Sequence, residues 1–190
     1  MVEFNVPHDI AIDEFIDNHV TEHFTRSAEN ADTSAMMGKE FTLQYNIGDA
    51  KYCLHIKDGD KLEIIKGGVD TPMLSLHMEE SNWRDYISGK IDAGLDRFID
   101  PTQLYDHKRY SALLEFKGTL FLKLRRDDGE TLVATICFNG AESPSATLKL
   151  KIPDWIGLQT GKKKGPMLFM TGKMKAGGDM GFIMKCQALM

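Results

Sequence analysis

The first apolar pattern along the chain is helical. Between residues 9 and 25, apolar side chains recur at steps of three and four, which places them on one face of an amphipathic helix with an acidic outer face. Asp9 is suited to cap this helix, and the small polar residues 27–38 predict a loop after it. The apolar positions are Ile12, Phe15, Ile16, Val20 and Phe24.

The pattern then changes to an alternation of apolar and polar residues, which is typical of half-buried strands. Residues 41–47, 52–56 and 61–65 alternate in this way. Short turns that contain Gly and Asp separate them, so they predict an antiparallel meander. Residues 73–78 predict a fourth strand, and residues 81–88 predict a helix.

The second half of the chain is also expected to be rich in strands. After a short helical region over 91–110, we expect a long strand over 112–124, strands over 131–138 and 146–152, a helix from Pro153 to about Thr160, a short strand over 172–175 and a last helix over 179–190. A helix followed by strands, with helices at one end, is typical of the α+β class. The pattern favours a mostly antiparallel sheet of five to seven strands.

Composition excludes several classes of function. The 190 residues carry a net charge of −5, which argues against a general nucleic-acid binder. No apolar run approaches the ~20 residues of a membrane span, and the acidic start lacks the features of a signal peptide. The three separate cysteines, Cys53, Cys137 and Cys186, suggest reduced thiols and a cytoplasmic protein.

The sequence contains no recognisable catalytic or metal-binding motif. There is no nucleophile elbow, phosphate-binding loop or dinucleotide fingerprint. His19 and His23 would share one face of the first helix, but no third ligand has a suitable spacing. We therefore expect no enzyme activity, no metal and no cofactor. The basic run Lys162–Lys164, with Lys173 and Lys175, is interpreted as a solvated loop or as a contact for phosphates, carboxylates or an anionic membrane surface.

Two stretches of the chain echo each other. Residues 75–90 and 147–162 both read as a strand, then Asn or Asp, then Trp, then five residues, then Gly-Lys. The two tryptophans of the chain, Trp83 and Trp155, occupy the same place in the two copies. Such an echo fits a motif shared by descent, or a favourable strand–helix unit that arose twice.

The second copy and the residues after it resemble the sterol carrier protein type 2 family. The resemblance consists of a strand, an acidic residue followed by Trp at a helix start, a Thr-Gly-Lys step, a Phe-x-x-Gly-Lys-hydrophobic-Lys segment and a Gly-rich turn into an apolar helix. In this chain those elements are Thr147–Ile152, Asp154-Trp155, Thr160-Gly161-Lys162, Phe169–Lys175, Gly178–Gly181 and the closing residues Phe182–Gln187.

The resemblance implies an α+β domain in which a twisted sheet is covered by helices, with an apolar tunnel for fatty acids, fatty acyl-CoA, sterols or similar lipids. The chain is longer than one such domain, and two organisations are open. Residues 1–190 could form a single sterol-carrier-like domain that is a merged, degenerate duplication of 38–125 and 119–190. Alternatively, one domain could carry an insertion around residues 91–112.

Methionine is concentrated at the end of the chain, with six of its eleven copies in the last 24 residues. The closing helix is apolar nearly all round, so we expect it to be enclosed. Flexible methionines suit a wall that must fit ligands of varied shape, although they also serve as core filler. With the resemblance, we expect a tunnel lined by Phe116, Leu120, Trp155, Leu158, Met167, Phe169, Met170, Met180, Ile183 and Met184.

The sequence thus predicts non-enzymatic binding or transfer of a hydrophobic small molecule. It predicts no nucleic-acid partner, and a transient contact with a membrane surface is one interpretation of the basic run. The alternative is an accessory interaction module that docks a partner protein through an apolar groove.

Overall fold

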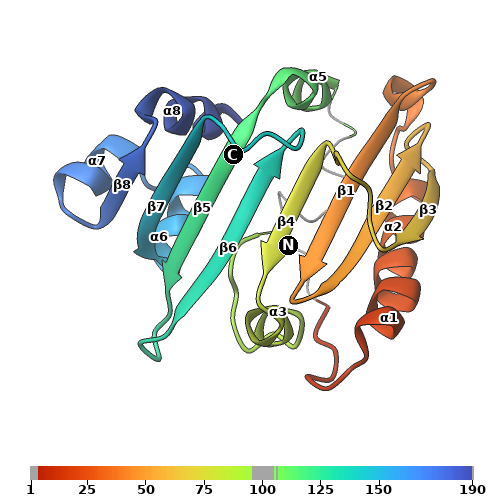
Figure 1. Ribbon diagram of the computed structural model, residues 1–190, viewed down its shortest axis with the longest axis horizontal. Coiled ribbons are helices and arrows are strands. Elements are labelled where there is room, and N and C mark those ends of the chain that lie inside the picture. Colours follow the sequence, from red (N-terminus) through yellow and green to blue (C-terminus); the bar gives the residue numbers. More distant parts are fainter. Residues whose placement is uncertain (1–3, 96–104, 106, 190) are drawn as a thin grey trace.

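An eight-stranded mixed sheet forms the centre of the protein, with the order β3-β2-β1-β4-β6-β5-β7-β8 (Figure 1). The computed structural model describes residues 4–95, 105 and 107–189. The strands are β1 (Glu40–Ile47), β2 (Ala50–Lys57), β3 (Lys61–Lys66), β4 (Leu74–Met78), β5 (Gly118–Arg125), β6 (Thr131–Phe138), β7 (Ser145–Lys151) and β8 (Met174–Gly178).

Helices flank the sheet along its length (Figure 1). The first helical stretch is continuous from α1 through a π-helical segment into α2, as its amphipathic pattern predicts. None of the helices in the described ranges has the length and apolar character of a membrane span. The helical elements are α1 (Ile12–Glu14), η1 (Phe15–Val20), α2 (Thr21–Glu29), the short η2 (Ser34–Met36), α3 (Glu80–Ile87), α5 (His107–Glu115), α6 (Ile152–Gln159), α7 (Gly165–Met170) and α8 (Met180–Leu189).

The two halves of the sheet repeat the same connection. In the first half, β1 and β2 form an antiparallel hairpin and β4 returns parallel to β1. In the second half, β5 and β6 form the hairpin and β7 returns parallel to β5. A helix follows each returning strand directly: α3 with Trp83 after β4, and α6 with Trp155 after β7. Antiparallel pairing of β4 with β6 joins the halves into one sheet.

These parallel pairs correct the expected sheet. We expected a mostly antiparallel sheet of five to seven strands, whereas the sheet is mixed and has eight. The alternation of apolar residues shows which face of a strand is buried, but it does not show the direction of the neighbouring strand. In the first half, the parallel direction of β4 beside β1 depends on residues 67–73. These residues carry the chain from β3 across β2 and β1 to β4 (Figure 1).

This crossing segment also covers part of one sheet face. The backbone N–H of Val69 donates to Gln44 Oε1 at 2.7 Å, and that of Met73 donates to Thr42 Oγ1 at 2.9 Å. Gln44 is therefore buried although it points away from the helices. The same face is open over β5, β6 and β7, where buried and more exposed residues alternate along each strand.

Two local expectations are wrong. Residues 112–115 were expected to begin a long strand, but they form the end of α5, and β5 begins at Gly118. Tyr110 and Leu113 are buried three positions apart on this helix, and the Tyr110 hydroxyl donates to the carbonyl oxygen of Glu40 at 2.9 Å.

Asp9 does not cap the first helix, which begins after Ala11 without a side-chain cap. Of the expected helical region over 91–110, residues 96–104 and 106 lie outside the described residues.

Gly118, the first residue of β5, lies close to Phe182 of α8. The Phe182 ring of α8 stacks on Phe116 with centroids 5.3 Å apart, and Phe116 meets Phe138 edge-on at 4.7 Å. Gly118 has φ +130°, and a Cβ there would clash with the Pro144 carbonyl oxygen and lie 2.6 Å from the Phe182 ring. Glycine is therefore required at this position by both backbone conformation and space.

We expect Gly118→Ala to lower the free energy of unfolding by about 2–4 kcal/mol. The added Cβ makes the positive φ unfavourable and also overpacks the contact with Phe182. Gly129→Ala is the matched control, since Gly129 also has positive φ (+89°) but no atom within 4 Å of an added Cβ. The control should cost about 1 kcal/mol. Urea unfolding of both variants measures the difference, and equal losses would contradict the close approach.

Candidate functional site

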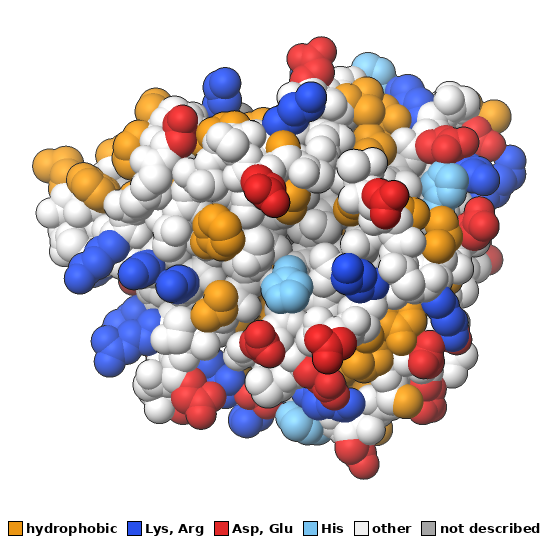
Figure 2. All heavy atoms as spheres, in the orientation of Figure 1, with side chains coloured by type: hydrophobic (Ala, Val, Ile, Leu, Met, Phe, Trp, Pro, Cys, Tyr) orange, Lys and Arg blue, Asp and Glu red, His pale blue; other side chains and the backbone are white. Residues whose placement is uncertain are grey.

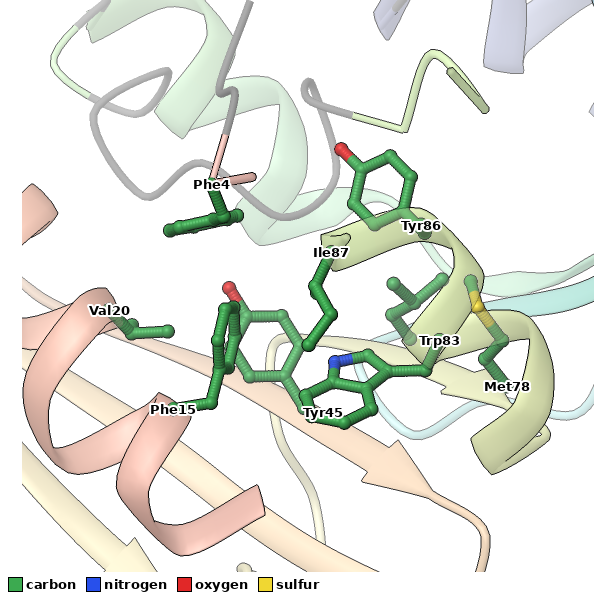
Figure 3. Close-up of a pocket in the computed structure, with 9 residues that line it drawn as sticks. Phe4, Phe15, Val20, Tyr45, Met78, Trp83, Tyr86 and Ile87 are labelled. Atoms are coloured by element: carbon green, nitrogen blue, oxygen red, sulfur yellow. The ribbon is translucent and has the colours of Figure 1, made fainter. Parts of the chain in front are cut away.

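An apolar pocket lies between the first helical stretch, α3 and the buried face of the sheet (Figure 3). The helical stretch is held over β3 by Lys66, whose Nζ donates to Asp13 at 2.7 Å and to Asp17 at 2.9 Å. All nine residues that line the pocket carry a hydrophobic or aromatic side chain, so it suits an apolar ligand. They are Phe4, Phe15, Val20, Tyr45, Leu76, Met78, Trp83, Tyr86 and Ile87.

Aromatic rings form the wall of this pocket on the helical side. Phe15 meets Phe4 edge-on with centroids 4.8 Å apart, and it meets Trp83 edge-on at 5.2 Å. His19 stacks on Phe15 at 6.0 Å, and His23 meets Phe4 at 5.7 Å. The two histidines thus pack behind the pocket, and the described residues contain no group of three or more side chains that could hold a metal ion.

The pocket is small. Its cavity volume is about 30 Å³, which is close to the share of one water molecule in the liquid, whereas pockets for drug-sized ligands have volumes of roughly 300–1,000 Å³. Phe4 is half-buried at its edge. A lipid can therefore enter only if Phe4 is displaced, or if the first helical stretch and α3 move apart.

Residues 4–10 form a strap that holds this arrangement. The backbone N–H of Val6 donates to the carbonyl oxygen of Ile87 at 3.2 Å. The Arg84 guanidinium donates to the carbonyl oxygens of His8 and Ile10 at 2.8 and 2.9 Å. These hydrogen bonds fix the strap against α3, so Phe4 stays over the pocket.

Asp85 connects the strap, α3 and the second half of the sheet. Its carboxylate accepts from Arg126 at 2.7 Å, from Lys90 at 3.0 Å and from His8 at 3.1 Å. Both Arg126 and Asp85 are buried, with 3% and 9% of their side chains exposed. Burial by itself would raise the pKa of Asp85, but the hydrogen bonds from Lys90, Arg126 and His8 outweigh it and hold the pKa below its usual value.

A second, open groove lies beside this network. It has a volume of about 660 Å³ and lies between residues 90–92, the β5–β6 turn and α6. Three of its four cations already have partners, because Lys90 and Arg126 bind Asp85, and Lys163 donates to Asp154 at 2.6 Å. An anionic ligand would therefore compete with existing ion pairs, and we regard the groove as the weaker candidate.

The structure separates the ten residues expected to line a tunnel into two groups. Leu120, Trp155 and Ile183 are buried, and Phe116 and Leu158 are half-buried. The other five lie at the surface with between 50% and 85% of each side chain exposed; they are Met167, Phe169, Met170, Met180 and Met184. The expectation that the closing helix is enclosed all round is therefore wrong, because Met180 and Met184 of α8 face outward. Ligand contact by the ten residues stays a prediction.

None of the pocket residues was among the expected site residues. Signals for some of them were present, because Phe15 and Val20 lie on the apolar face of the first helix and Trp83 lies in the repeated motif. No pattern in the sequence shows that these two elements meet over Tyr45 and Leu76 of the sheet. That contact depends on the crossing segment before β4.

Two of the three cysteines are poor nucleophiles. Burial raises the pKa of Cys53 to about 11 and that of Cys186 to about 12. Both thiols therefore stay protonated at neutral pH and lack the thiolate that reacts. Cys137 is half-buried on β6, and its sulfur lies 3.5 Å from the carbonyl oxygen of Ala141.

Comparison with known sequences identifies the second half of the chain. Residues 103–190 match the SCP-2 sterol transfer family. The resemblance to sterol carrier proteins is confirmed for these residues. The SCP-2 match contains α5 to α8 and β5 to β8, including the second copy of the Trp motif, whereas the first copy and the apolar pocket lie before it. Among curated proteins, no sequence matches the chain significantly.

Solved structures include two similar sterol carrier proteins. The sterol carrier protein domain 2 of Helicoverpa armigera is 20% identical, with a TM-score of 0.37 over 55% of this chain and 84% of that one. Sterol carrier protein 2 of Yarrowia lipolytica is 22% identical, with a TM-score of 0.36 over 50% and 78%. The sec-alkylsulfatase Pisa1 from Pseudomonas sp. matches 88% of this chain with 15% of its own, at 14% identity and a TM-score of 0.22.

We expect Arg126→Met to lower the free energy of unfolding by about 3 kcal/mol, because it leaves the buried Asp85 carboxylate without its closest partner. Arg125→Met is the matched control, since Arg125 is exposed and has no ion pair with a described residue. It should change stability by less than about 0.5 kcal/mol. Urea unfolding distinguishes the two variants, and similar losses would show that Asp85 does not need Arg126.

The lowered pKa of Asp85 also predicts a loss of stability in acid. An unfolded aspartate titrates near about pH 3.9. The ionised network therefore contributes fully above that pH and is lost as the pH falls through the folded pKa of Asp85. Asp85→Asn removes this dependence. Unfolding midpoints of the wild type and the variant should differ at pH 7 and converge below about pH 4; a constant difference would contradict the prediction.

Proposed function

We propose that the protein binds and carries a hydrophobic small molecule, such as a fatty acid, a fatty acyl-CoA or a sterol-like lipid, without chemical conversion. The SCP-2 match over residues 103–190 supports the ligand class. The observation that carries the proposal is the pocket wall, in which all nine lining residues have hydrophobic or aromatic side chains. Affinity would come from burying the ligand, at roughly 0.8 kcal/mol per CH₂ group.

The proposed ligand position is the pocket between the first helical stretch and α3. Its walls are separate elements that meet through side chains, and the Phe15 ring bridges Phe4 and Trp83. Edge-to-face ring pairs can shift without breaking a backbone hydrogen bond, so the pocket can widen around an alkyl chain. Release of the strap residues 4–10 would open it further.

The second half of the chain offers another ligand position. Trp155 is fully buried and its indole N–H donates to the carbonyl oxygen of Gly94 at 3.1 Å. Together with Leu120, Leu158 and Ile183, it lies in the part of the chain that the SCP-2 match covers. If the ligand lies there, the original expectation for the C-terminal half holds, and the pocket near Trp83 is a packing defect.

The two tryptophans allow these positions to be distinguished. The chain has only Trp83 and Trp155, so Trp155→Phe leaves one reporter in the pocket and Trp83→Phe leaves one in the C-terminal half. We expect a spin-labelled fatty acid, which quenches fluorescence at short range, to quench Trp83 saturably in the first variant. Trp155 should be quenched little in the second.

Extraction of the purified protein followed by mass spectrometry supplies the ligand's identity. The control for unspecific partition into apolar surface is the corresponding spin-labelled alkane, which lacks the carboxylate of the fatty acid. Saturable quenching of Trp155 alone would move the site to the C-terminal half. An empty protein in which neither tryptophan is quenched, but which holds a stable protein partner, would replace the proposal with the interaction module.

A further inference from the structure

The two halves of the chain carry opposite charge. Residues 1–95 contain eight basic and eighteen acidic residues, whereas residues 96–190 contain fifteen basic and ten acidic residues. The first half therefore has a formal charge of −10 and the second half +5, although the whole chain is acidic. The acidic balance of the chain thus conceals a basic half.

Part of this positive charge is arranged in rows on the open face of the sheet. Lys123 of β5 is in register with Lys149 of β7, and Lys149 is in register with Lys175 of β8. In the next row, Arg125 is in register with Lys151. Neighbouring strands lie about 4.8 Å apart, and like charges placed directly opposite each other destabilise a sheet.

Nothing in the described chain neutralises these rows. All five side chains are exposed, and none forms an ion pair with another described residue. The outward positions of the three strands hold no acidic residue: they carry Thr, Phe, Lys and Arg on β5, Ser, Thr and Lys on β7, and Lys and Gly on β8. The surface is therefore built to meet negative charge from outside the molecule.

Exposed apolar side chains lie next to this basic face. Five of the large hydrophobic residues that are most open to solvent lie on α7 and α8, where Met170 is 85% exposed and Met184 is 71% exposed. Figure 2 shows hydrophobic side chains at the end of the molecule that holds α7 and α8, beside basic side chains over β5, β7 and β8. Lys162, Lys164, Lys173 and Lys185 add exposed positive charge to the same segments.

We propose that this docking surface, formed by α7, α8 and the open face of β5, β7 and β8, binds the protein to an anionic lipid bilayer. A bilayer offers negative headgroups for the lysine rows and a hydrocarbon boundary for the methionines and Phe169 within one surface. Methionine and lysine side chains are long and flexible, so they can extend into both layers. The surface is separate from the pocket near Trp83, and the proposal does not depend on the ligand carried there.

Two other occupants fit less well. A symmetric contact with a second copy would place the lysine rows of one chain against those of the other, and like-charge contacts oppose such a dimer. A nucleic acid would bind the lysines but would leave the exposed methionines of α7 and α8 in water. The bilayer is the occupant that uses both the charge and the apolar side chains.

The test measures flotation of the lipid-free full chain with vesicles of phosphatidylcholine alone, or of phosphatidylcholine with phosphatidylserine. We expect binding only to the anionic vesicles. It should weaken steeply as salt shortens the screening length from about 10 Å at 0.1 M to about 3 Å at 1 M. Replacing Lys123, Lys149 and Lys175 together by Gln should weaken binding by about a hundredfold.

A matched triple variant removes the same charge elsewhere. Lys51, Lys57 and Lys61 lie on β2 and β3, and their replacement by Gln should leave vesicle binding unchanged. For the apolar part, Met170→Gln with Met184→Gln should weaken binding, whereas Met37→Gln should not, although Met37 is also 67% exposed. These residues are at the surface, and circular dichroism checks that each variant is folded.

Equal binding to neutral and anionic vesicles would overturn the proposal, as would equal losses in the two lysine triples. No effect of the Met170 and Met184 changes would also overturn it. Concentration-dependent self-association, or RNA binding, that the docking-surface variants abolish while vesicles are not bound would assign the surface to another occupant. A failure of fatty-acid quenching at Trp83 and Trp155 would not alter any of these outcomes.

Discussion

A β-strand at the edge of a sheet leaves a row of unpaired backbone groups, and the architecture of this protein depends on how that constraint is met in its middle. β4 would be the edge of the first half and β6 the edge of the second. Their antiparallel pairing, from Leu74 with Phe138 to Met78 with Ala134, satisfies both edges at once. The Asp85–Arg126 pair crosses the same junction, because Asp85 follows β4 on α3 and Arg126 follows β5. The backbone pairing of β4 with β6 and the buried ion pair between Asp85 and Arg126 therefore both hold the two halves together.

The repeated connection in each half supports the proposal that the chain is a merged duplication. Each half has a hairpin, a strand that returns parallel to the first strand of the hairpin, and a helix that carries a buried Trp. The junction explains why the halves are unequal. β3 pairs with β2 in the first half, whereas in the second half β4 occupies the place beside β6 that a third strand would fill.

The sequence predicts the existence of most elements because their periodicity reflects local burial. The strands around Leu43, Leu54 and Leu148, and the helix around Phe15, lie where alternation and helical spacing place them. Prediction from the sequence fails where a contact between residues far apart in the chain determines the local structure. Residues 112–115 are apolar enough for a strand, but burial of Leu113 and Tyr110 on one side makes them helical. The closing helix is apolar nearly all round, and no local pattern shows that Met180 and Met184 face outward.

The position of the candidate pocket could not be predicted from the sequence. The methionine-rich end and the motif around Trp155 indicate a lipid carrier, and the SCP-2 match covers that half. The apolar pocket lies in the other half, because it needs the strap, α3 and the first helical stretch together. Met167, Met170, Met180 and Met184 lie on the surface, beside a basic face that the net charge of the whole chain conceals. In the proposed function, the pocket near Trp83 carries the ligand, and the docking surface selects the membrane to which the ligand is delivered.

The two outer strands of the sheet determine what else the chain can join. β3 is six residues long and carries Lys61, Glu63 and Lys66, and β8 is five residues long with Lys175 and two glycines at its end. Short, charged edges resist pairing with further strands. Both edges of the eight-stranded sheet are therefore protected against such pairing. Copies of the chain at high concentration should stay apart along their edges instead of polymerising into a continuous ribbon.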